Sequence, residues 1–209
     1  MNYKVLLRIF LSACLAVFIS TLPSLGQNTT SSRYEVAEES SMTIIGTSNV
    51  TDWDAAVQTV NGSMLLNSGG RNWSEVDPSW FEEVYISIPV SDIDSGPKPM
   101  NDNIYSALKQ EEHPEIIYRL EDIREMAVTD NGEQLELTVN GVLSVAGKEQ
   151  DLNQLIRINI LENGDLEVTG STDMKMTDFN VTPPTFMRGA LTTDENITVE
   201  FQLVFKIQA

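Results

Sequence analysis

The segment Ile197-Thr198-Val199-Glu200-Phe201-Gln202-Leu203-Val204-Phe205-Lys206-Ile207 carries the clearest structural signal in this sequence. Its odd positions are all apolar, whereas Glu200, Gln202 and Lys206 are among the even positions between them. Successive side chains of a β-strand point to opposite faces of the sheet. The pattern therefore predicts a half-buried strand with one apolar face and one face in water.

The same alternation recurs through most of the chain and predicts further strands. Its apolar positions are Val84, Ile86, Ile88 and Val90; Ile116, Tyr118 and Leu120; Leu135, Leu137, Val139, Leu143 and Val145; Ile156, Ile158 and Ile160; and Leu166 and Val168. Asn-Gly pairs at 61–62, 131–132 and 163–164 lie between such runs, and Asn-Gly favours the tight turns of β-hairpins. Hairpins join antiparallel strands, so the sequence predicts an antiparallel sheet.

One segment, around residues 101–109, has a helical pattern instead. Ile104 and Leu108 are spaced i, i+4, Asn101 or Asp102 can cap the start, and Pro114 follows the end. We expect one short helix there.

The N-terminus resembles an export signal. Residues 1–26 combine Lys4 and Arg8 with an apolar run over 9–19 and small residues near a cleavage site after Gly26. The run is shorter than the ~20 residues that cross a bilayer, so we expect cleavage, a periplasmic or secreted protein, and no stable membrane insertion afterwards. A minor alternative is a lipoprotein anchored at Cys14. Residues 27–40 are polar without periodicity and predict a mobile leader before a domain over 41–209.

Composition disfavours several classes of function. There are 13 Lys and Arg against 31 Asp and Glu, a net charge of -18, which disfavours nucleic-acid binding. One cysteine and one histidine, His113, leave little for a zinc site, a thiol nucleophile or a catalytic triad. The acid pairs Asp52/Asp54 and Asp92/Asp94 are interpreted as solvated loop residues. The sequence therefore predicts no catalytic site, no metal site and no cofactor.

Five strings, taken in order over residues 41–207, resemble the YceI-like family of exported bacterial lipid-binding proteins. They are 46–53 (GTSNVTDW), 88–96 (IPVSDIDSG), 100–109 (MNDNIYSALK) followed by 113–116 (HPEI), 141–147 (GVLSVAG) and 176–185 (MTDFNVTPPT). The resemblance implies an all-β fold, an eight-stranded antiparallel lipocalin-like barrel with one or two short helices. It also implies a lumen that holds an isoprenoid tail, such as that of a polyprenyl phosphate or a quinone.

The sequence departs from the better-studied branch of the family between Met100 and Leu108, where that branch has more His and Arg. With few cations available, a neutral ligand such as a quinone, or another apolar lipid, fits better than a pyrophosphate. The cations to examine for a phosphate are Arg119, Lys148, Lys175 and Arg188.

Candidate ligand-binding residues follow from the alternation. They are Ile86, Ile88, Ile116, Tyr118, Leu137, Val139, Ile156, Ile158, Val199, Phe201 and Leu203. A filled barrel or a sandwich core would use the same apolar faces. Two further groups are placed at the two mouths of the barrel: Met100, Ile104, Tyr105 and Leu108 as a lid at one, and Met174, Met176, Phe179 and Met187 at the other.

The leading hypothesis is non-catalytic sequestration or transport of an apolar lipid. The alternative is a cell-envelope interaction or scaffold module with a filled barrel and an acidic partner-binding face. An esterase that uses Asp52 and Asp54 is a distant third, and the sequence leaves a homodimer open.

Overall fold

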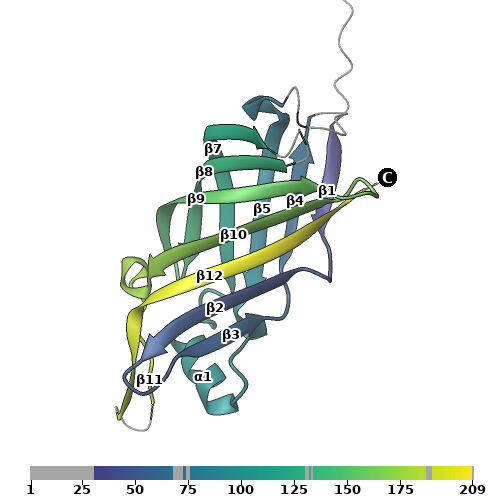
Figure 1. The fold of residues 1–209 in the computed structure, drawn as a ribbon. Coiled ribbons are helices and arrows are strands. Elements are labelled where there is room, and N and C mark those ends of the chain that lie inside the picture. The colour runs from purple at the N-terminus through teal and green to yellow at the C-terminus, as the bar shows by residue number, and fades with distance from the viewer. Residues whose placement is uncertain are drawn as a thin grey trace, which may run out of the picture.

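A closed antiparallel sheet forms the body of the protein (Figure 1). The computed structural model describes residues 31–67, 73, 76–129, 132, 134–186 and 190–208. Around the barrel the strands follow the order β1 (Ser32–Val36), β4 (Asn61–Leu66), β5 (Phe81–Pro89), β7 (Glu115–Thr129), β8 (Gln134–Val145), β9 (Lys148–Ile160), β10 (Leu166–Lys175) and β12 (Leu191–Ile207). Pairing of β1 with β12 closes the ring. The predicted all-β, eight-stranded antiparallel barrel is confirmed.

Shorter strands continue the barrel beyond bends in the chain. They are β2 (Ser41–Ser48), β3 (Trp53–Val57) and β6 (Ile93–Asp94), which pair in the order β12-β2-β3-β6. Strand β1 pairs with residues 205–207 of β12 and β2 pairs with residues 193–202, so β1 and β2 act as one bent strand along β12. Figure 1 shows β2 and β3 below β12, and β1 near its other end. A short strand, β11 (Thr185–Phe186), pairs with the beginning of β12.

The barrel begins earlier in the chain than the sequence predicted. Within the proposed leader 27–40, residues 32–36 form β1, which is hydrogen-bonded to β4 on one side and β12 on the other. Tyr34 in this strand is buried. A five-residue strand with a single buried side chain is too short to show a period, and pairing on both edges stabilises it instead. The proposed signal peptide 1–26, Cys14 and residues 27–30 lie outside the described residues.

Two of the turns differ from the Asn-Gly predictions. Asn61-Gly62 lies in β4 and not in a hairpin turn. The β8–β9 hairpin instead turns at Ala146 and Gly147, both with positive φ (51° and 80°), as a type I′ turn requires. Gly164 does have positive φ (88°), between β9 and β10. Gly132 has it between β7 and β8 (98°), but Asn131 lies outside the described residues.

The one α-helix in the described part of the chain is α1 (Lys98–Ala107), which lies across the lower end of the barrel in Figure 1. It begins before the predicted start, after Pro97, so neither Asn101 nor Asp102 is its N-cap. The Asn101 amide instead accepts from the Ser95 backbone N–H at 2.8 Å and donates to Asp94 Oδ1 at 2.8 Å. These bonds attach the first turn of α1 to β6. None of the helices in the described segments is long and apolar enough to cross a membrane.

The end of the barrel away from α1 is packed solid. Leu66, Trp73, Leu135 and Leu166 are each no more than 2% exposed, and the Trp73 ring stacks on Phe81 with centroids 6.4 Å apart. Buried large side chains of this kind contribute most of the hydrophobic stabilisation of a small domain. We therefore expect this packed end to dominate the stability of the fold.

The substitution Leu135→Ala is expected to lower the free energy of unfolding by about 2–4 kcal/mol, because it leaves a cavity at a fully buried position. The matched control is Leu155→Ala on β9, where the leucine is 43% exposed and the expected loss is below about 1 kcal/mol. Denaturant unfolding of both variants measures the difference. Equal losses would show that the packed end is not the main source of stability.

Candidate functional site

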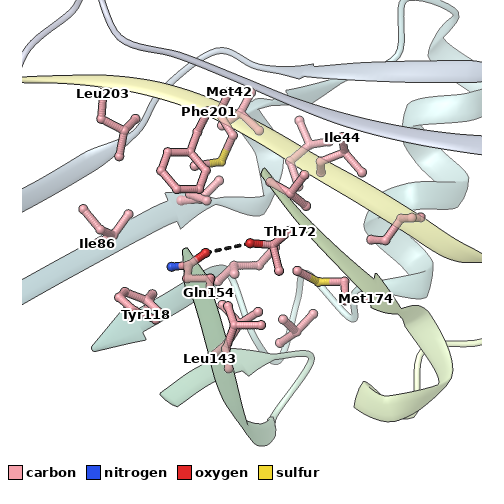
Figure 2. Close-up of a pocket in the computed structure, with 18 of the residues that line it drawn as sticks. Met42, Ile44, Ile86, Tyr118, Leu143, Gln154, Thr172, Met174, Phe201 and Leu203 are labelled. Atoms are coloured by element: carbon pink, nitrogen blue, oxygen red, sulfur yellow. Dashed lines mark hydrogen bonds between the residues drawn. The ribbon is translucent and has the colours of Figure 1, made fainter. Parts of the chain in front are cut away.

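Between the packed end and α1 the barrel encloses an apolar cavity of about 230 Å³. Apolar cavities of roughly 150 Å³ already accept a benzene-sized guest. All eleven candidate residues from the sequence, from Ile86 on β5 to Leu203 on β12, line this cavity. Their contact with a ligand remains a prediction, but their inward orientation follows from the alternation. Figure 2 shows residues from opposite walls, including Ile86, Leu143 and Phe201, facing the same space.

The cavity is also lined by residues that the sequence analysis did not select. Met42 and Ile44 from β2 and Trp53 from β3 form part of the wall, and Gln154 and Thr172 add polar groups to it. The sequence alone could have identified Gln154 as a candidate residue of the cavity wall. It stands at the inward position in the series Leu152, Gln154, Ile156 and Ile158, where the alternation calls for an apolar residue.

The two groups that the sequence placed at opposite mouths lie at one end, which corrects that expectation. Leu108, the C-cap of α1, packs against a cluster containing Met176 and Phe179 of the 3₁₀ helix η4 (Met176–Phe179). The antiparallel order explains this, because β10 ends on the same side of the barrel where β7 begins. Ile104 and Met174 also line the cavity.

Met100 and Tyr105 were expected in the lid but do not line the cavity. Tyr105 Oη donates to the carbonyl oxygens of Ser91 (2.9 Å) and Ile93 (3.1 Å), so this side chain attaches α1 to the barrel. Met187 and Arg188 lie outside the described residues.

Inward-facing glycines keep bulky side chains against the wall. The rings of Trp53, Tyr118 and Phe201 lie over Gly46, Gly141 and Gly170 respectively, each on a neighbouring strand, where a Cβ atom would collide with the ring. Ile86 covers Gly62 in the same way. A glycine opposite an aromatic residue lets the ring lie flat on the sheet. These pairs therefore leave the centre of the lumen open.

Few polar groups reach the cavity. Thr172 Oγ1 donates to Gln154 Oε1 at 2.7 Å, drawn as the dashed line in Figure 2. The Trp53 indole donates outward to the Thr47 carbonyl oxygen at 3.1 Å. Tyr118 Oη is buried without a hydrogen-bond partner among the described residues, and burial raises the pKa of this phenol.

Of the four cations selected from the sequence, only Lys175 lines the cavity in the described structure. Its Nζ lies 2.6 Å from Glu195 Oε1. This hydrogen bond raises the pKa of Lys175 and lowers that of Glu195, so both groups are charged at neutral pH and their charges offset each other. Arg119 lies outside the lumen, over the Tyr85 ring, and Lys148 is exposed.

Two residues of the acid pairs, Asp54 and Asp94, are exposed as predicted but lie in β3 and β6 and not in loops. Asp94 accepts from the Gly96 backbone N–H and the Asn101 amide, both at 2.8 Å, and these bonds lower the pKa of its carboxyl. In the described ranges no group of three or more His, Cys, Asp or Glu side chains could hold a metal ion. The His113 ring packs over Gly147 in the β8–β9 turn.

Comparison with known proteins agrees with this architecture. The model of the YceI-like domain matches residues 34–205. A polyisoprenoid binding domain from Saccharophagus degradans, implicated in plant cell wall breakdown, is similar in structure with a TM-score of 0.62 at 13% identity, covering 84% of this chain and 98% of that one. BcnA from Burkholderia cenocepacia has a TM-score of 0.57 at 17% identity, covering 79% and 95%.

The YceI protein of Campylobacter jejuni is also similar, with a TM-score of 0.51 at 12% identity, covering 74% of this chain and 84% of that one. At these identities the similarity concerns the fold. No curated protein matches the sequence.

Filling one glycine position should close the lumen. Gly170→Val is expected to push the Phe201 ring inward and weaken binding of the neutral fluorescent probe N-phenyl-1-naphthylamine at least about tenfold, because the ring then occupies the guest's space. Ser171→Val is the matched control, since it adds the same side chain to the exposed face of β10. Fluorescence titration measures binding and circular dichroism checks the fold. Unchanged binding in a folded Gly170→Val protein would show that the glycines do not keep the cavity open.

Proposed function

The chain belongs to the YceI-like family, and we propose that it is an exported lipid-binding protein that holds an isoprenoid chain in its barrel without changing it chemically. The observation that carries the proposal is the cavity itself, which is walled almost entirely by carbon from β2, β5, β7, β8, β9, β10 and β12. The similarity to a polyisoprenoid binding domain supports the same class of ligand.

The hydrophobic effect is large enough for such a ligand. At about 0.8 kcal/mol per buried CH₂, three isoprene units supply on the order of 12 kcal/mol. The lower estimates of the free-energy cost of association are about 4 kcal/mol, and the remainder corresponds to roughly micromolar binding. A hydrocarbon tail alone is therefore a sufficient anchor, and methionines such as Met42 and Met174 can adapt to its shape.

The charge distribution favours a neutral ligand. Lys175 is the cation that borders the cavity in the described structure, but its side chain is half exposed and Glu195 already offsets its charge. A diphosphate group would have to compete with this carboxylate in a protein of net charge -18. We therefore propose a neutral prenyl lipid, such as an isoprenoid quinone, in preference to a prenyl phosphate.

Export and the absence of catalysis belong to the same proposal. The signal-peptide pattern of residues 1–26 supports a periplasmic or secreted location. The acidic pair Asp52 and Asp54 does not line the cavity, which argues against an esterase acting on a lipid bound there. The alternative is a scaffold whose barrel is filled by its own side chains. Only the packed end is filled in this way, whereas a cavity lies between that end and α1.

Protein purified from the periplasmic fraction of its native host should carry the lipid. An organic extract analysed by mass spectrometry is expected to contain a prenyl lipid in about one-to-one ratio, and the mature chain should begin at Gln27. Protein carrying Gly170→Val should lose most of this lipid, whereas Ser171→Val should keep it. A wild-type extract free of lipid would contradict the proposed function.

Removing the carboxylate beside Lys175 should change headgroup preference. Wild-type protein is expected to bind geranylgeranyl diphosphate no more tightly than geranylgeraniol, whereas Glu195→Gln should tighten diphosphate binding about two- to fivefold at low salt by freeing the ammonium. Asp173→Asn, on an exposed side chain of β10, controls for the change in net charge. Competition against the fluorescent probe measures both ligands. A strong wild-type preference for the diphosphate would rule out a neutral headgroup.

A further inference from the structure

The wall of the lumen contains one group of polar side chains whose hydrogen-bonding capacity is not fully used within the protein. Five described lining residues carry a side-chain nitrogen or oxygen: Trp53, Tyr118, Gln154, Thr172 and Lys175. The Trp53 indole N–H and the Lys175 ammonium have partners, the Thr47 carbonyl and the Glu195 carboxylate. The other three side chains come from β7, β9 and β10 and face the middle of the cavity (Figure 2).

The Gln154 amide has a defined orientation. Its Oε1 accepts from Thr172 Oγ1 at 2.7 Å, and Thr172 is buried, with 8% of its surface exposed. This bond leaves the Nε2 end of the amide pointing away from Thr172, toward the side of the cavity where Tyr118 lies (Figure 2). Among the described residues Nε2 donates no hydrogen bond to a protein acceptor, although the amide is close enough to the Tyr118 phenol to oppose the rise in its pKa. Gln154 therefore offers an N–H donor to the lumen.

Tyr118 offers a second donor. Its Oη is fully buried and has no hydrogen-bond partner among the described residues. The ring is held over Gly141. Burial raises the pKa of the phenol and the nearby Gln154 amide only partly opposes this, so the group stays protonated at neutral pH and keeps its O–H. Buried polar groups in folded proteins are almost always hydrogen-bonded, so an unpartnered one in a binding cavity requires an explanation.

We propose, on the basis of the lipid-binding function above, that Tyr118 Oη and Gln154 Nε2 bind a neutral oxygen atom of the ligand. The ligand class is then a prenyl lipid that carries a carbonyl or hydroxyl oxygen, held with this oxygen inside the lumen. Thr172 is a positioning residue that orients the amide. Two neutral donors suit a single carbonyl or hydroxyl oxygen, whereas a phosphate would require cations, and the cation of the described lining, Lys175, is already paired with Glu195.

The choice of probes separates oxygen recognition from burial of the tail. Geranylgeraniol and the hydrocarbon in which a methyl group replaces its hydroxymethyl group share the same chain. Displacement of N-phenyl-1-naphthylamine gives the affinity of each. Comparing how one substitution affects the two probes removes the difference in their solubility, as in a double-mutant cycle.

Tyr118→Phe is expected to weaken geranylgeraniol binding about five- to tenfold and to leave hydrocarbon binding unchanged, because only the alcohol loses a hydrogen bond. Gln154→Leu should have the same selective effect. Tyr85→Phe is the matched control, since it removes a phenolic oxygen from a β5 residue that is not part of the cavity lining. Thermal unfolding confirms that each variant is folded.

The outcomes distinguish this proposal from the function on which it rests. If Tyr118→Phe changes neither affinity, or weakens both probes equally, the polar site does not recognise the ligand and the proposal is overturned, while lipid binding stands. If wild-type protein binds neither probe, the proposed function itself fails.

Discussion

The structure depends on keeping the inside of a narrow barrel partly empty. Eight strands enclose an interior that is just wide enough for side chains to fill. Three of the largest side chains on the inner wall, Trp53, Tyr118 and Phe201, avoid filling it because each lies flat over a glycine of a neighbouring strand. These rings lie along the wall, and the cavity is the space that they leave between them.

The two ends of the barrel differ in their packing. At one end Leu66, Trp73, Leu135 and Leu166 pack to full burial and supply the hydrophobic stabilisation of a chain whose single cysteine lies in the proposed signal peptide. At the other end α1 and η4 cover the lumen with adaptable side chains such as Leu108 and Met176. Hydrogen bonds from Tyr105 and Asn101 attach α1 to the residues around β6. Part of the buried core thus lies in a region that the ligand does not need to enter.

The main electrostatic feature of the protein is that charged groups are kept out of the lumen. Most of the acids are on exposed positions, and the lumen itself is almost free of charge, since the Lys175 ammonium is paired with Glu195. Against this apolar background the Tyr118 phenol and the Gln154–Thr172 pair are the polar features of the inner wall. A few polar groups in an otherwise apolar pocket orient a ligand, while the apolar surface supplies most of the affinity.

The alternation of apolar residues by itself determined β5, β7, β8, β9, β10 and β12 and the inward orientation of all eleven candidate residues, because side-chain direction in a strand is a local property of the backbone. It could not reveal that Gly62 lies in a strand, that 32–36 form β1, or that Met176 and Leu108 share one end, since these depend on pairing between distant segments. Nor could it separate an open lumen from a filled one. An inward residue has the same sequence pattern in both, and only the register that sets Phe201 opposite Gly170 decides whether space remains.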